Sequence, residues 1–102
     1  MRFLMKISFP VEAGNAAAKK DGFKVVDTIL GQQKPEAAYF VAIGGRRTCL
    51  MIIDLVSASD IPRIAEPWFL ALHASIEVMP AMVAEDLRNA APAIEQAVND
   101  FG

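Results

Sequence analysis

Apolar and polar residues alternate along residues 2–9, and this period of two predicts a β-strand. Its apolar face consists of Phe3, Met5, Ile7 and Phe9. Pro10 ends the strand, because proline cannot donate a hydrogen bond to a sheet. Residues 75–82 alternate in the same way and predict another strand. Pro80 indicates either that this strand lies at a sheet edge or that it ends there.

Between these runs, the apolar spacing becomes that of a helix. The first helix is predicted from about Glu12 to Leu30, with Gly31 as its end. Gly14 and Gly22 leave its start open, because glycine is a poor helix former.

A second helix is predicted to begin near Asp60, with Ser59 as its N-cap and Trp68 on its apolar side. Pro67 lacks a backbone N–H, so we expect this helix to kink or restart there. The tail is helical in pattern from about Glu85, with a second helical piece beginning at Pro92. The apolar stripe of the tail consists of Ile94, Ala97, Val98 and Phe101.

Residues 36–56 predict two strands joined at Gly44-Gly45, a dipeptide that supplies the positive φ angles of a two-residue hairpin turn. The turn sets the register of the hairpin. On one face Ile43 pairs with Arg46, Val41 with Thr48 and Tyr39 with Leu50, and on the other Ala42 pairs with Arg47, Phe40 with Cys49 and Ala38 with Met51.

The order strand, helix, hairpin, helix, strand, terminal helix is that of ferredoxin-like βαββαβ folds with an extra C-terminal helix. Right-handed crossovers place the strands in the order four, one, three, two of a four-stranded antiparallel sheet. A chain of 102 residues has room for one core, so residues 1–102 are expected to form a single α+β domain.

Both faces of this sheet are apolar. The face under the helices is expected to hold Phe3, Met5, Ile7, Phe40, Cys49, Met51, Ile53, Ile76 and Val78. The opposite face still holds Leu4, Tyr39, Val41, Leu50, Ile52 and Met79. Two helices cannot cover both faces, so a second copy of the sheet is the simplest cover, and we expect a homodimer around a barrel-like interior. A hydrophobic content of 54% agrees with a covered second face.

Composition excludes several classes of partner. The net charge of −2 offers no basic surface for nucleic acid. No apolar stretch reaches the ~18 residues of a membrane span, and no secretory signal pattern is present. Cys49 is the single cysteine, which argues against a disulfide scaffold and for a cytoplasmic protein. One histidine and one cysteine without metal-ligand spacing predict no metal, and the lack of a glycine-rich phosphate loop predicts no cofactor.

The element order resembles that of the dimeric α/β-barrel superfamily across nearly the whole chain. A narrower resemblance, to small uncharacterised bacterial proteins of that group, lies in KPEAAYF at 34–40, EPWFLAL at 66–72 and EVMPAMVAEDL at 77–87. The resemblance implies a dimeric barrel. Other branches include muconolactone isomerases, cofactor-independent monooxygenases and stress-responsive barrel proteins, but none of their catalytic motifs matches this sequence residue by residue, so no catalytic residue is assigned.

Polar side chains on the expected dimer-facing side of the sheet form the first candidate site. These are Lys6, Ser8, Tyr39, Thr48, Asp54 and Glu77. Lys6 lies on a central strand and could meet Asp54 on one side and Glu77 on the other. The charges form either an ion pair that fixes register or dimer orientation, or part of a ligand or acid–base site.

Three further residues have a structural and a functional interpretation. Trp68, with Phe69 beside it, either lines a pocket or belongs to the core. His73 acts as a base or complements the C-terminus of its helix. Cys49 lies on an apolar strand face, which is more typical of a small buried residue than of a nucleophile.

Two functions remain open. In the first, the barrel binds a small, mostly apolar organic molecule, oriented by Lys6, Tyr39, Asp54 and Glu77. An enzyme of this kind would be an isomerase or monooxygenase that needs no cofactor. The second is a structural or regulatory dimer without small-molecule chemistry. A pocket of roughly 300 Å³ or more with convergent polar groups favours the first, and an interior filled by side chains favours the second.

Overall fold

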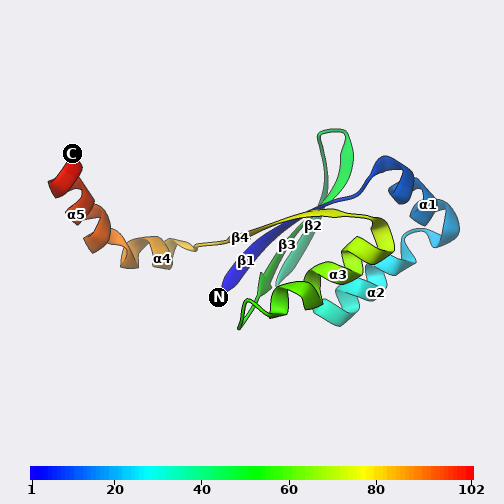
Figure 1. The fold of residues 1–102 in the computed structure, drawn as a ribbon, viewed down its shortest axis with the longest axis horizontal. Helices are drawn as coiled ribbons and strands as arrows, with labels where there is room; N and C mark the ends of the chain where they lie inside the picture. The colour runs from blue at the N-terminus through cyan, green and yellow to red at the C-terminus, as the bar shows by residue number, and fades with distance from the viewer.

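The computed structural model describes residues 1–102, which form a four-stranded antiparallel sheet and five helices (Figure 1). The strands are β1 (Arg2–Ser8), β2 (Ala37–Ile43), β3 (Arg46–Asp54) and β4 (Ser75–Pro80). The helices are α1 (Val11–Asp21), α2 (Lys24–Gln33), α3 (Asp60–Leu72), α4 (Ala84–Asn89) and α5 (Ala91–Phe101). The strands lie in the order β2-β3-β1-β4, so the predicted α+β class and antiparallel sheet are confirmed.

The β2–β3 hairpin has the predicted register. Gly44 and Gly45 occupy the turn with φ angles of 60° and 76°, a region that glycine adopts without steric cost. Tyr39 lies opposite Leu50, and the residue pairs on either side follow in step. The register places alternate side chains of β2 and β3 on opposite faces of the sheet.

The pattern predicts one helix before β2, and the structure has two. α1 ends at Gly22, and Gly22 and Phe23 have left-handed φ angles of 64° and 66°. The backbone N–H of Lys24 then donates to a carboxylate oxygen of Asp21 at 3.0 Å as the second helix begins. Gly22 permits this break because it has no Cβ to clash in the left-handed conformation.

Neither the predicted helix end at Gly31 nor the predicted restart at Pro67 is present. α2 continues through Gly31 and ends at Lys34, which adopts a left-handed φ of 48° directly before Pro35. α3 continues through Pro67 without restarting. Packing of the apolar side of α3 against the sheet outweighs the one hydrogen bond that proline cannot make, since Trp68 in the next position is fully buried.

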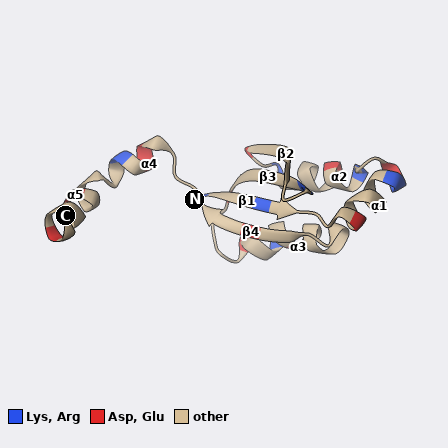
Figure 2. Ribbon diagram, turned by 90° about the horizontal axis from the view of Figure 1, so that it is seen from above, with Lys and Arg blue, Asp and Glu red and all other residues tan.

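The core lies between one face of the sheet and the helices α2 and α3, which both lie on that side (Figure 1). Five strand residues of this face are buried, namely Met5, Ile7, Cys49, Met51 and Ile53. The helices contribute Val26, Ile29, Ile64, Ala65, Trp68 and Leu72. No helix covers the second face of the sheet (Figures 1 and 2).

The tail extends away from the rest of the molecule in both views (Figures 1 and 2). Pro92 lies in the first turn of α5, as predicted, and no residue of α5 is buried. The molecule measures 58 × 28 × 20 Å, with a radius of gyration of 17.2 Å. A compact chain of this length has a radius of gyration of about 13 Å, so the tail accounts for the elongated shape. None of the helices is both long enough and apolar enough to cross a membrane.

Candidate functional site: a pocket between α2 and β2

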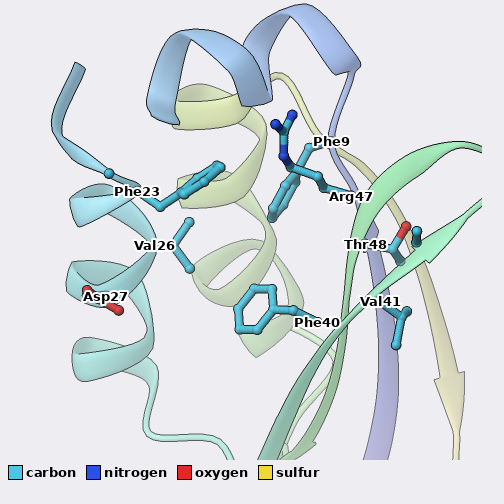
Figure 3. A pocket seen from close by; sticks show the side chains of 10 residues that line it. Phe9, Phe23, Val26, Asp27, Phe40, Val41, Arg47 and Thr48 are labelled. Atoms are coloured by element: carbon cyan, nitrogen blue, oxygen red, sulfur yellow. The ribbon is translucent and has the colours of Figure 1, made fainter. Parts of the chain in front are cut away.

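A pocket of about 480 Å³ opens between α2 and the edge strand β2 (Figure 3). Its lining comes from the β1–α1 connection, the break between α1 and α2, and the β2–β3 hairpin. The lining residues are Phe9, Gly22, Phe23, Val26, Asp27, Phe40, Val41, Ala42, Arg47 and Thr48. The volume is that of a typical small-molecule site.

The pocket exists because the helices leave β2 uncovered. No residue of β2 is buried, although β2 is as apolar as β1 and β3. Phe40 is predicted to lie under the helices, yet its exposed fraction is 53%. Its ring faces the helix side of the sheet and lies across the pocket from Val26 and Phe23 (Figure 3). An exposed aromatic ring in a concave apolar site is a surface that a ligand can cover.

Arg47 supplies the positive charge of the pocket. One of its Nη atoms donates to the side-chain oxygen of Asn15 at 3.0 Å, and its Cζ lies 5.4 Å from the centre of the Phe23 ring. No carboxylate lies within 4.0 Å of its guanidinium. Arg47 is therefore held by an amide and an aromatic ring, and its charge is free to pair with an anion.

Gly14 in α1 makes room for this arginine. A Cβ atom at position 14 would lie 2.7 Å from an Nη atom of Arg47. Asp27 lies on the opposite side of the pocket from Arg47, on the exposed surface of α2 (Figure 3). The floor is fixed by Phe9, whose ring stacks on the buried Trp68 with 5.9 Å between ring centres. The arrangement suits a molecule with an apolar body and one anionic group.

The predicted polar site on the other face of the sheet forms in part. Lys6 and Glu77 are directly opposite each other on β1 and β4, and their charged atoms are 4.0 Å apart. Asp54 is not beside Lys6, because the antiparallel register places Leu50 opposite Lys6 and Arg2 opposite Asp54. Ser8 and Thr48 pair across the same two strands.

Asp54 instead contacts the chain's own terminus. The N-terminal amino group donates to a carboxylate oxygen of Asp54 at 2.7 Å, and this hydrogen bond holds the pKa of Asp54 below its usual value. A second hollow of about 580 Å³ lies beside this pair, and four of its charged groups are paired, since Arg2 also binds Glu36 at 2.8 Å. Asp86 also lines this hollow and has no cationic partner; one of its carboxylate oxygens accepts a hydrogen bond from the backbone N–H of Val83 at 2.9 Å.

The remaining candidates have structural surroundings. Trp68 is fully buried, and its Nε1 donates to the side-chain oxygen of Gln33 at 3.1 Å. His73 is the C-cap of α3, where a left-handed φ of 52° ends the helix. Cys49 is buried among apolar residues, and this desolvation raises the pKa of its thiol to about 11. Tyr39 is exposed on β2, on the face opposite the pocket.

The hairpin register contains a signal for the pocket, because it places Arg47 on the apolar face of the sheet. Arg46 and Arg47 look like an ordinary solvated pair, but the hairpin register sends them to opposite faces. Arg47 thereby shares a face with Phe40 and Cys49, and a charge in an apolar row is unusual there. The position of Gly22 and Phe23 at the pocket could not be predicted from the sequence pattern, because it depends on where the helix breaks.

No group of three or more His, Cys, Asp and Glu side chains is placed to hold a metal ion.

No protein-family model matches the chain, and no curated protein matches it. Among solved structures, protein Atu4242 from Agrobacterium tumefaciens is similar at 17% sequence identity, with a TM-score of 0.38. The match covers 82% of this chain and 96% of that protein.

Proposed function

We propose that this protein binds a small aromatic or otherwise apolar carboxylate in the pocket between α2 and β2. The observation that carries the proposal is Arg47, an arginine without a carboxylate partner at the rim of an apolar pocket of about 480 Å³. A guanidinium binds a carboxylate through two parallel hydrogen bonds. The exposed Phe40 ring supplies the apolar surface that such a ligand would cover.

The proposal is for binding rather than for catalysis. Arg47 and Asp27 are the two ionisable side chains that line the pocket. Arginine stays protonated at physiological pH and cannot act as a base. Asp27 is exposed and lies across the pocket from Arg47 (Figure 3), so no acid–base pair is assembled there.

We also propose that the protein has the ferredoxin-like arrangement and assembles as a homodimer through the uncovered sheet face, as in dimeric α/β barrels. Tyr39, Val41 and Met79 expose apolar surface on this face, and Leu4, Leu50 and Ile52 are only half-buried. A second copy of the chain would remove this surface from water. The structural dimer without a ligand remains the alternative function, and the binding experiment separates the two.

The binding experiment is a thermal-shift comparison of benzoate, phenylacetate and 2-naphthoate with the neutral analogues benzamide and 2-naphthol. At ten times its Kd, a ligand stabilises by about 1.4 kcal/mol, which raises the Tm of a domain of this size by roughly 5–10 °C. We expect shifts with the carboxylates and smaller ones with the neutral compounds.

Matched variants locate the effect. Arg47→Gln should abolish the carboxylate shift, whereas Arg46→Gln, one residue away on the other face of the hairpin, should leave it unchanged. Phe40→Ala should weaken the shift with all the aromatic compounds. If no carboxylate stabilises the wild-type protein, or if Arg46→Gln and Arg47→Gln behave alike, the proposed ligand class is wrong.

A further inference from the structure

The C-terminal arm, which we define as residues 84–102, carries an apolar stripe with nothing to cover it. On α5 the stripe consists of Ile94, Ala97, Val98 and Phe101, and its last two residues expose 60% and 91% of their surface; Leu87 on α4 is a further exposed apolar residue of the arm. α5 is strongly amphipathic in sequence, with polar Gln96 and Asn99 on its other side. A short helix of this kind is marginal in water unless its apolar side packs against another surface.

The arm is directed away from its own subunit. The backbone N–H of Ala81, just after β4, donates to the carbonyl of Arg2 at 3.0 Å, so the chain is held to β1 at the point where the arm departs. From there the arm extends along the long axis of the molecule (Figures 1 and 2). The surface that covers the stripe must therefore come from another molecule.

The β2–β3 hairpin offers a complementary surface on the same chain. Tyr39, Val41 and Ile43 expose apolar side chains on one face of β2, and Arg46 lies opposite Ile43 on that face. The side chain of Arg46 forms no hydrogen bond or ion pair within the subunit. This docking strip lies on the opposite face of the sheet from Arg47 and Phe40, and Val41 is the one residue of the strip that also lines the ligand pocket.

The charges of the two surfaces are opposite. Residues 84–102 contain four acids and one base, a net charge of −3, which leaves +1 for residues 1–83 of the total of −2. α5 itself holds Glu95 and Asp100 and no base, whereas the docking strip holds Arg46 and no acid. Opposite charges at the rim of an apolar contact favour this pairing over contact between two acidic arms.

The area of the sheet face is smaller than the area that a stable dimer buries, so a further contact between the subunits is expected. With β2 left for the arm, the three strands β1, β3 and β4, of about seven residues each at about 4.8 Å spacing and 3.3 Å per residue, cover about 330 Å². Stable dimers bury about 800 Å² per partner. A helix of 11 residues is about 16 Å long and 10 Å wide, so an exchanged arm and the strip that receives its counterpart together add about 320 Å² per subunit.

We infer that the arm of each subunit docks through Leu87, Ile94, Val98 and Phe101 on the Tyr39–Val41–Ile43–Arg46 strip of a second copy of this chain. The two arms are exchanged, and each dimer has two such contacts. This inference rests on the proposed homodimer and specifies the part of the interface that contact between the two sheets does not supply.

Sedimentation equilibrium on full-length variants tests the inference. Ile94→Lys/Val98→Lys places two charges on the stripe, and Gln96→Lys/Asn99→Lys places the same two charges on the opposite side of α5. All four positions are exposed, so both variants should fold like the wild type, which circular dichroism checks. We expect the stripe variant to raise the dimer Kd at least tenfold and the control variant to change it less than threefold.

The outcomes separate this inference from the homodimer itself. A wild-type protein that stays monomeric at 100 μM overturns both. A wild-type dimer with the same Kd in the stripe variant overturns the arm contact and leaves the sheet-face dimer standing. Equal weakening by the two variants overturns the stripe as the contact surface, because charge alone would then explain the loss.

Photo-crosslinking identifies the surface that the arm reaches. A benzophenone maleimide on Ala97→Cys, at the margin of the stripe, reacts on irradiation with whatever lies beside the arm, while the buried Cys49 stays unlabelled. In a mixture of ¹⁴N and ¹⁵N subunits, we expect crosslinks that join the two isotopes and map to residues 37–46. Crosslinks to the partner's arm, or only within one isotope, overturn the exchange.

Discussion

The absence of a side chain at Gly14 leaves space for the guanidinium of Arg47 beside the pocket. Gly14 lies within α1 and is buried against the Arg47 side chain, whereas Gly31 lies within α2, where no atom would come within 4 Å of an added methyl group. Both are helix-interior glycines, where alanine is favoured by about 1 kcal/mol. They therefore form a matched pair that separates helix stability from the position of the guanidinium.

We predict that Gly31→Ala raises stability by about 0.5–1 kcal/mol and leaves the carboxylate-induced thermal shift unchanged. Gly14→Ala should displace the guanidinium, because the new Cβ would lie 2.7 Å from its Nη atom. The carboxylate Kd should rise several-fold with little loss of stability, as measured by titration calorimetry and urea unfolding. Equal carboxylate affinity in the two variants would contradict this role of Gly14.

Cys49 gives a prediction about pH. Burial raises the pKa of its thiol from 9.0 to about 11. Between these values the unfolded thiol ionises while the folded thiol remains neutral, so the folded state binds more protons. The contribution of Cys49 to stability is therefore complete below pH 9 and declines as the pH rises to about 11. Urea unfolding from about pH 8 to about pH 11 should show a steeper loss in the wild type than in Cys49→Ala; parallel curves would refute it.

At the scale of elements, the break between α1 and α2 determines where the pocket can form. Gly22 and Phe23 both line the pocket, and both have left-handed φ angles. Phe23 reaches Arg47 only because the helix breaks at this point. The phenylalanine is held in a conformation that side chains rarely adopt, and the adjacent glycine lets the chain turn without a second such cost.

We predict that Gly22→Ala destabilises the fold by about 1–2 kcal/mol, although no atom lies within 4 Å of the new methyl. The cost arises from the left-handed φ of 64° and not from a clash. Gly22→Asn should cost less, since asparagine tolerates this conformation better. Chemical denaturation measures both, and a neutral Gly22→Ala would mean that one continuous helix forms instead.

At the scale of the whole molecule, the energetic contribution of the Lys6–Glu77 ion pair depends on whether the sheet face is covered by a second subunit. In the single subunit the two side chains expose 32% and 67% of their surface, and an ion pair so exposed stabilises by less than about 1 kcal/mol. Within the proposed sheet-face dimer the same pair would be enclosed, and removal of one partner would leave the other charge buried and unpaired.

We predict that Lys6→Met changes monomer stability by less than about 1 kcal/mol but raises the dimer Kd at least tenfold. Lys6→Met/Glu77→Met should recover much of the lost affinity, because two apolar side chains replace the pair. Sedimentation of the three proteins over a range of concentrations measures the effect. A ligand-orienting role for the pair, as opposed to a structural one, would appear as loss of the carboxylate shift in the double variant.

The sequence by itself determined the strands, their order and the register of the β2–β3 hairpin. Gly44-Gly45 fixed the hairpin, so Tyr39 was correctly expected opposite Leu50. The adjacency of the first and last strands, with the alternation along each, correctly placed Lys6 beside Glu77. The expectation that Asp54 lies beside Lys6 was wrong, because strand order alone does not fix which residues pair along an antiparallel register.

Only the tertiary structure decided where the helices break and that they leave β2 uncovered. Helix continuity depends on packing energies that outweigh local propensity, so α3 continues through Pro67 while the chain turns at Gly22. The pocket follows from the space between α2 and β2, which no local pattern encodes. The position of the arm is likewise a tertiary property. The sequence pattern shows that α5 has an apolar stripe, but only the structure shows that α5 lies away from the core of its own subunit.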